Sequence, residues 1–235
     1  MNEAQWIIFG VAIDPSPIFL TFKVALVTTL VLLIIGIPMA WWMARMQSRW
    51  KVLLEAVVAL PLVLPPTVLG FYLLILMNPE GSLASALRVF GHDGQLTFTF
   101  AGLVVASVFY SLPFAVQPLM HAFEQVPQDL IDAAKTMRAK TYDWFYTIVL
   151  PLSRRGLLTA ATLAFAHTVG EFGVVLMVGG NIPGETRMVS IAIFDHVETL
   201  EYAQAHVLST LMLIFSFSVL FLVYALNRRF AVKVG

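Results

Sequence analysis

The sequence predicts an all-α integral membrane protein with five membrane-spanning helices, and three observations support this fold class. Of the 235 residues, 59% are hydrophobic and only 12% are charged, whereas soluble domains have about 45–50% apolar and about 25% charged residues. Five long stretches are almost free of charge, and each can cross the roughly 30 Å of hydrocarbon in a bilayer. Lysine and arginine gather in alternate connections between them. Most soluble enzymes and a long disordered tail are thereby excluded.

The five spans are expected where the chain lacks acidic and basic residues. These stretches are residues 24–44, 56–78, 96–123, 156–184 and 202–227, and only Glu171 interrupts the fourth. They are too long for core helices of a soluble protein and too numerous for anchors. Lys23 precedes the first stretch, so we expect that helix to begin near Ile18.

The N-terminal residues 1–13 form an apolar segment ahead of the first span. They lack the basic region of a signal peptide, so we expect them to lie along the membrane interface with Trp6 as an anchor. The Asp-Pro-Ser-Pro run then ends this segment. We divide the chain into an external segment, a transmembrane domain and a cytoplasmic tail, at residues 1–17, 18–230 and 231–235.

The distribution of lysine and arginine predicts the orientation. Eleven of the 14 fall on one side: Arg45, Arg49, Lys51, Lys135, Arg138, Lys140, Arg154, Arg155, Arg228, Arg229 and Lys233. The other side has Lys23, Arg88 and Arg187. Because cytoplasmic loops carry the excess of basic residues, the N-terminus is expected outside and the C-terminus in the cytoplasm. A sixth span at residues 188–201 stays open, although that segment is too short to cross and is better explained as a short helix or a re-entrant piece.

The longest cytoplasmic segment, residues 124–155, is expected to hold a short helix at residues 126–137. Pro127 suits a first helical position, and acidic residues follow it at the positive end of the helix. An apolar stripe is formed by Ile131, Ala134 and Met137.

A second, aromatic-rich segment follows at residues 141–150, with Pro151 expected to end it and Ser153 to cap the next span. Two interpretations stay open for the whole connection. Both segments could be amphipathic helices on the membrane surface. Alternatively, the first is a docking element whose alanine pair lets a partner approach closely.

The Asp-Ala-Ala run at residues 132–134, with Arg138 and the Leu-Pro at residues 150–151, resembles the loop of binding-protein-dependent ABC transporter permeases. In that family the loop holds the coupling helix, which sits in a cleft of a separate ATPase. Arg138 stands where the family has glycine, which permits a tight turn, so we expect Arg138 to make that turn differently. The resemblance implies coupling roles for Asp129, Asp132, Ala133, Ala134, Met137 and Arg138.

A second resemblance is to molybdate-transport permeases of the ModB type. It rests on Leu-Pro-Leu-Val-Leu-Pro-Pro at residues 60–66, His-Thr-Val-Gly-Glu-Phe-Gly at 167–173 and Gly-Gly-Asn-Ile-Pro-Gly-Glu-Thr-Arg at 179–187. Sulfate and thiosulfate permeases share the Gly-Glu-aromatic-Gly part but diverge after the Gly-Asn pair. The expected substrate is therefore molybdate, with tungstate also open and sulfate or thiosulfate as the alternative.

The resemblance implies the transmembrane domain of a type I ABC importer in a bacterial or archaeal cytoplasmic membrane. The expected partners are a second copy of the chain, two cytoplasmic ABC ATPase subunits, an external oxyanion-binding protein and the lipid bilayer, with no nucleic acid. The sequence has no phosphate-binding loop, so the chain is not expected to be an enzyme or to bind a cofactor, and the partner ATPase uses ATP and magnesium. An ion-coupled carrier, a channel or a membrane scaffold would lack that loop too, so these alternatives stay open.

Candidate pore or gate residues lie in the second and fourth spans. Pro61, Pro65 and Pro66 are expected to bend the second helix, either as a packing kink or as a pore-lining pivot. In the fourth span the candidates are Gly170, Glu171 and Gly173.

Glu171 is an intramembrane acid, and such residues are functional candidates by default. We expect it to pair with a base such as Lys23 or to hydrogen-bond the backbone near the two glycines. A proton relay or metal pair with His167, one helical turn earlier, is the less favoured alternative. No metal site is expected, because two ligands at one spacing need partners elsewhere, and the sequence has no cysteine.

The external loop at residues 179–187 has turn chemistry. It is either an ordinary surface turn or a contact for the external binding protein. In the second case Asn181, Glu185 and Arg187 are the candidate docking residues.

Overall fold

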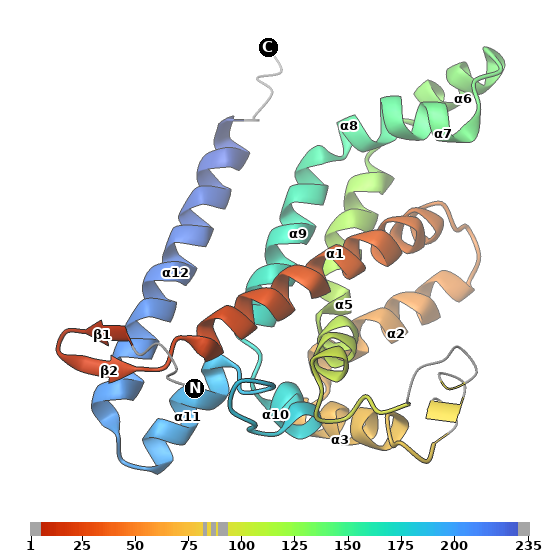
Figure 1. Ribbon diagram of the computed structural model, residues 1–235. Helices are drawn as coiled ribbons and strands as arrows, with labels where there is room; N and C mark the ends of the chain where they lie inside the picture. The colour runs from red at the N-terminus through yellow and green to blue at the C-terminus, as the bar shows by residue number, and fades with distance from the viewer. Residues whose placement is uncertain (1–5, 82–83, 86–87, 89–93, 230–235) are drawn as a thin grey trace.

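The computed structural model describes residues 6–81, 84–85, 88 and 94–229, and it is a bundle of helices with one β-hairpin (Figure 1). Three described helices are long and apolar enough to cross a membrane: α1 (Ser16–Ala44), α5 (Phe100–Glu124) and α12 (Tyr202–Arg229). Two sharply bent helix pairs bring the number to five if each pair is one span: Trp50–Val63 with Pro66–Leu76, and Thr141–Leu152 with Arg154–Val169. The helical fold class and the five-span prediction agree with this arrangement.

The N-terminal segment is a hairpin of β1 (Trp6–Ile8) and β2 (Val11–Ile13). The Asp14 carboxylate then accepts hydrogen bonds from the backbone N–H and the hydroxyl of Ser16, at 2.8 and 2.6 Å. This turn ends the hairpin, as the Asp-Pro-Ser-Pro run predicts, and α1 begins at Ser16, slightly earlier than the expected Ile18.

The second span is broken into α2 (Trp50–Val63) and α3 (Pro66–Leu76), which meet at 109°. Pro65 precedes α3 and Pro66 opens it. Neither residue has an N–H to continue the helical ladder, so the predicted bend is confirmed. The helix begins at Trp50 rather than at residue 56. Its first turns contain two charged residues, Lys51 and Glu55, and both are in ion pairs, since Lys51 contacts Glu55 as well as Glu124 of α5.

Helix α5 lies at the centre and packs against α1 and α9 (Arg154–Val169). It starts at Phe100, and the Thr99 side chain caps it by accepting a hydrogen bond from the Gly102 N–H at 3.1 Å. The main core is formed by buried residues of α1 and α5, Val58 of α2, residues of the loop after α5 and Ala160 of α9. Besides Val58 and Ala160 they are Ala40, Met43, Val116, Leu119, Met120, Phe123, Val126, Ile131, Trp144 and Val149.

The loop after α5 holds α6 (Gln128–Thr136), and then α7 (Thr141–Trp144), the π-helical turn η1 (Phe145–Val149) and α8 (Leu150–Leu152) in one run. Two expectations are wrong here. Pro151 lies inside α8, and the break comes only at Ser153. The hydroxyl of Ser153 does not cap α9 but lies 3.5 Å from the Ala122 carbonyl oxygen of α5.

The expected span at residues 156–184 is not one helix. Helix α9 ends at Val169, and α10 (Gly173–Gly179) begins after a short break. Gly173 packs where a Cβ would lie 2.9 Å from Pro66 Cβ, so this break meets the break between α2 and α3. The expected short helix at residues 188–201 is α11 (Val189–Glu198), which precedes α12.

Candidate functional site

The predicted docking helix α6 is fastened to the bundle by one buried side chain. Ile131 is 2% exposed and packs with Phe123 and Trp144. Ala134 is half-buried beside them, whereas Ala133 is exposed. Met137 is 83% exposed, so the expected stripe of three does not form a single packed face. The helix therefore holds one side against the bundle and leaves Ala133 accessible.

Arg138 ends this helix in the left-handed conformation, with φ of +59°. Its N–H donates to the Lys135 carbonyl oxygen at 2.9 Å, and the Ala139 N–H donates to the Ala134 carbonyl oxygen at 3.1 Å. These two bonds make the Schellman ending that usually contains glycine. The expectation that Arg138 turns the chain differently from glycine is therefore wrong: it adopts the glycine-type conformation, against the steric preference of a residue with a Cβ.

The other predicted loop residues lie on the outer side of α6. Asp129 occupies the first turn and is exposed. The Asp132 carboxylate accepts hydrogen bonds from Gln128 Nε2 at 3.0 Å and Lys135 Nζ at 3.3 Å. These contacts are local, and they leave the helix surface charged.

The end of α1 contributes a residue that the sequence did not single out. The Arg45 guanidinium donates to Gln128 Oε1 at 2.8 Å and to the carbonyl oxygens of Phe123 and Val126, both at 3.3 Å. It also lies over the Trp41 ring, 4.6 Å from the centroid. Burial lowers the pKa of Arg45 from its ordinary value, opposed by the charge of Asp132. Arg45 therefore ties α1, the end of α5 and α6 together, and only its place in a basic cluster could have drawn attention to it.

Glu171 lies in the break between α9 and α10 and is 3% exposed. Its carboxylate accepts hydrogen bonds from the hydroxyls of Ser107 at 2.5 Å and Ser111 at 2.8 Å, both on α5. Its backbone carbonyl accepts from the Ser190 hydroxyl. Neither expected partner is found: Lys23 lies over the Phe100 ring at 4.7 Å, and the carboxylate bonds the two serine hydroxyls rather than the backbone near Gly170 and Gly173.

Ser111 links this cluster to its neighbours, because its hydroxyl oxygen also lies 2.9 Å from Thr168 Oγ1 and 2.9 Å from His167 Nδ1. A hydroxyl has one proton, so when Ser111 donates it in a hydrogen bond to the carboxylate, its oxygen can accept one from Nδ1–H of the imidazole. The ring stacks on Phe114, with the centroids 3.9 Å apart. Among the described residues, no group of three or more His, Asp and Glu is placed to hold a metal ion.

The two helix breaks meet at a cavity of about 520 Å³. Its lining includes Pro66, Gly170, Glu171 and Gly173 but neither Pro61 nor Pro65. Pro61 lies inside α2, two residues before its end at Val63. The structure thus brings four of the six predicted gate residues to one place.

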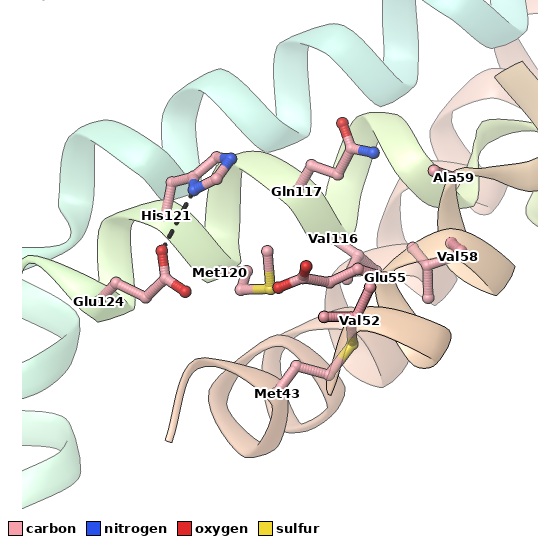
Figure 2. A pocket seen from close by; sticks show the side chains of 11 residues that line it. Met43, Val52, Glu55, Val58, Ala59, Val116, Gln117, Met120, His121 and Glu124 are labelled. Atoms are coloured by element: carbon pink, nitrogen blue, oxygen red, sulfur yellow. Dashed lines mark hydrogen bonds and ion pairs between the residues drawn. The ribbon is translucent and has the colours of Figure 1, made fainter. Parts of the chain in front are cut away.

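A second cavity of about 610 Å³ opens between the ends of α1, α2 and α5 (Figure 2). Met43, Val58 and Val116 make its apolar part, and Figure 2 shows His121 and Glu124 on the α5 side. Glu124 pairs with Lys51 Nζ at 2.7 Å, which joins the start of α2 to the end of α5.

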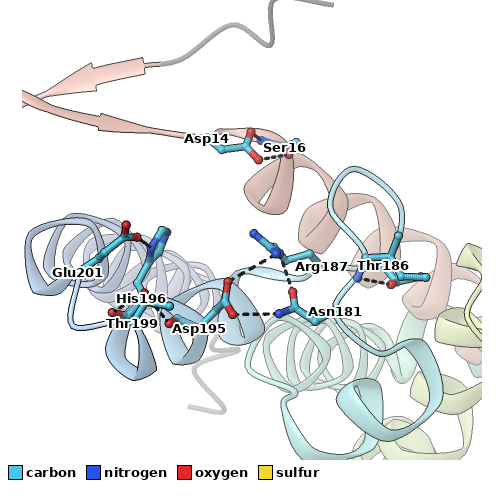
Figure 3. A network of polar contacts seen from close by, with 10 residues as sticks. Asp14, Ser16, Asn181, Thr186, Arg187, Asp195, His196, Thr199 and Glu201 are labelled. Atoms are coloured by element: carbon cyan, nitrogen blue, oxygen red, sulfur yellow. Dashed lines mark hydrogen bonds and ion pairs between the residues drawn. The ribbon is translucent and has the colours of Figure 1, made fainter.

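The loop at residues 179–187, which the sequence predicts to be external, is braced against α11 (Figure 3). Arg187 Nε donates to Asn181 Oδ1 at 2.5 Å, its Nη2 lies 3.5 Å from Asp195 Oδ2, and Asn181 Nδ2 donates to Asp195 Oδ1 at 3.1 Å. The Thr186 hydroxyl donates to the Gly179 carbonyl oxygen at 2.6 Å. Of the three predicted docking residues, two are therefore partners in this brace and Glu185 is exposed.

Comparison with known proteins identifies the family of this chain. The family described as binding-protein-dependent transport system inner membrane component matches residues 36–232. This chain belongs to that family.

Relatives of this permease family include curated proteins. A molybdenum transport system permease protein ModB from Azotobacter vinelandii is 59% identical over 217 residues, covering 92% of this chain and 95% of the relative. The ModB protein of Escherichia coli K12 is 38% identical over 190 residues, covering 79% and 82%. The sulfate transport system permease protein CysT of the same strain is 30% identical over 238 residues, covering 100% and 85%.

Solved structures of ABC transporters share the permease fold. A bacterial transporter that imports alginate matches with a TM-score of 0.73 at 14% identity, covering 92% of this chain and 79% of that one. The inward-facing MetNI methionine transporter matches with a TM-score of 0.66 at 18% identity, covering 91% and 94%. The expected type I importer fold is confirmed.

Proposed function

We propose that the chain is the permease subunit of an ATP-driven importer that moves molybdate into the cytoplasm. This proposal rests on the 59% identity to the Azotobacter vinelandii molybdenum permease over nearly the full length of both chains. Identity to the sulfate permease is about half as high over a comparable length. Tungstate, a tetrahedral dianion like molybdate, is expected to share the path.

The assembly that we propose contains two copies of the chain, two ABC ATPase subunits that hydrolyse ATP, and an external oxyanion-binding protein. The N-terminus lies outside and the C-terminus in the cytoplasm. Two features support this orientation. Most lysines and arginines fall in the connections on one side, and α6 lies at the same end of the bundle as the C-terminal end of α12 (Figure 1).

In this assembly, α6 is the coupling helix. The exposed face around Ala133, with Asp129 and Met137, meets the ATPase, while Ile131 and Arg45 pass its displacement to the bundle. ATP binding and the loaded binding protein would bias the same two-state equilibrium from opposite ends.

The gate is proposed where the helix breaks meet. The break between α2 and α3 touches the break between α9 and α10 at Pro66 and Gly173, and the half-helices on either side are proposed to pivot there. Asn181, Glu185 and Arg187 are proposed to form the external face for the binding protein, with Arg187 holding the loop in shape.

The deciding experiment reconstitutes the chain in vesicles with its ATPase and binding protein and measures uptake of labelled molybdate with and without ATP. Competition with excess sulfate and with tungstate ranks the substrates. We expect ATP-dependent uptake that tungstate inhibits and sulfate leaves almost unchanged. Equal uptake by the chain alone would refute the ABC assignment, and preferred uptake of sulfate would refute the substrate.

A further inference from the structure

The N-terminal hairpin is apolar throughout and yet largely exposed. Its sequence, residues 6–13, is Trp-Ile-Ile-Phe-Gly-Val-Ala-Ile, without a single polar side chain. Ile7 is 77% exposed and Phe9, at the turn, is 90% exposed. A water-facing hairpin usually carries polar side chains on its outer face, so this surface needs another environment.

One face of the hairpin already has a partner. In the register Ile8 pairs with Val11 and Trp6 with Ile13, so these side chains share a face. Ile13 is 3% exposed and packs with residues of α11 and α12, with Ile8 and Val11 beside it. The opposite face carries Ile7 and Ala12 and leads to Phe9 at the tip. The exposed surface is therefore a separate face, held in place by the packed one.

The hairpin adjoins an exposed apolar stripe on α1 through Trp6, which lies on the packed face. Trp6 packs edge-on against Phe19, with ring centroids 5.7 Å apart. Phe19, Leu26 and Leu30 are each more than half exposed, and their spacing places them on one side of the helix. Because α1 crosses the bilayer, the contact between Trp6 and Phe19 places the hairpin beside the lipid-facing surface of α1.

The unpaired backbone groups of the hairpin limit how deeply it can enter the bilayer. Both strands of a two-stranded sheet are edges with unpaired N–H and C=O groups, and such groups are too costly in the hydrocarbon core. The headgroup boundary accepts both the apolar side chains and the polar edges, and it is where tryptophan is enriched. Figure 1 shows the strands lying across the direction of α12, beside its start, as expected for an element parallel to the membrane plane.

We propose that the β1–β2 hairpin is an interfacial membrane anchor, with Phe9 and Ile7 inserted among the headgroups and upper acyl chains of the outer leaflet. Its partner is the phospholipid surface. The hairpin thereby holds the outer ends of α11 and α12 against α1 at a fixed height in the bilayer. This inference rests on the proposed orientation with the N-terminus outside and does not depend on the substrate.

Because the chain contains no cysteine, a label attached to an introduced cysteine reports on that position of the chain alone. Phe9→Cys and Ile7→Cys are labelled with an environment-sensitive fluorophore, and the complete transporter is reconstituted in phosphatidylethanolamine and phosphatidylglycerol vesicles. Quenching is measured with lipids brominated near the top of the acyl chain and with aqueous iodide. Glu198→Cys, exposed on α11 at the same end, is the water-facing control, and Phe217→Cys, 68% exposed on α12, is the lipid-facing control.

We expect the labels at positions 7 and 9 to lose intensity in brominated lipid and to resist iodide, as at position 217, with the reverse at position 198. Quenching by iodide without quenching by brominated lipid would overturn the proposal. So would protection that appears only when the binding protein is added, or a disulfide between two copies of the unlabelled Phe9→Cys chain. Molybdate uptake is measured on the same vesicles, so a failure of the proposed function is recognised separately.

Discussion

Replacing Arg45 by alanine should loosen the coupling between ATP hydrolysis and transport without preventing assembly. The Arg45 guanidinium is the polar link between the end of α1, the last carbonyls of α5 and Gln128 of α6. Alanine removes all these bonds and the stacking on Trp41. The exposed face of α6 around Ala133 is left as it is, so the ATPase should still bind.

The size of the effect follows from the contacts. The Gln128 bond faces water and contributes little, whereas the two longer carbonyl bonds contribute about 0.5–1 kcal/mol each and the stacking about 0.5 kcal/mol. The total is about 2 kcal/mol, roughly 30-fold in the equilibrium between an attached and a detached loop. Ile131 continues to hold α6, so we expect a several-fold fall in substrate transported per ATP hydrolysed.

The assay measures ATP hydrolysis and molybdate uptake in the same vesicles and reports their ratio. Arg49→Ala is the matched control, because Arg49 is a basic residue of the same connection but is exposed at the start of α2. Arg45→Lys should give an intermediate ratio, since an ammonium keeps the charge but not the planar fork. An unchanged ratio in Arg45→Ala, or an equal fall in Arg49→Ala, would refute the role of Arg45 as a link.

Three further substitutions test the other contacts. Glu171→Gln offers one acceptor oxygen to two serine hydroxyls. We therefore expect reduced uptake and a lower melting temperature in detergent, because the protein loses about 1 kcal/mol of stability. Wild-type values in both assays would contradict the structural role. Ala133→Trp should leave the melting temperature unchanged, because Ala133 is exposed, and should prevent co-purification of the ATPase; a coupled complex would show that the docking face is elsewhere. Arg187→Ala removes the contacts to Asn181 and Asp195, so we expect faster protease cleavage of the external loop and weaker stimulation of ATP hydrolysis by the binding protein, whereas unchanged stimulation would limit the brace to a local role.

Hydropathy predicts the spans because a bilayer imposes one simple requirement on them, a long run of apolar residues. It misplaces their ends where charges are paired. Lys51 lies inside α2 rather than before it, since it meets Glu124 of α5 at 2.7 Å. A rule that treats every charge as the edge of the membrane cannot anticipate a partner far away in the sequence.

The candidate site was predicted in its parts but not in its contacts. The prolines predicted the break between α2 and α3, because their backbone effect is local, whereas the break between α9 and α10 was not predicted. The partners of Glu171 were missed, since Ser107 and Ser111 carry no charge and occur 60 or more residues earlier. A signal was available in their spacing, because serines four residues apart on an apolar helix share one face.

The polar links of the bundle converge on α5. Glu171 binds its middle, whereas Lys51 and Arg45 bind its C-terminal end. The two helix breaks, in contrast, lie in the flanking spans and touch each other at Gly173 and Pro66. A span with fixed polar contacts along its length resists bending, whereas a span already broken can pivot at small cost. We therefore expect α1 and α5 to move as one rigid pair in alternating access while the broken spans pivot at their breaks, with α6 delivering the displacement at the end of α5 where Arg45 binds.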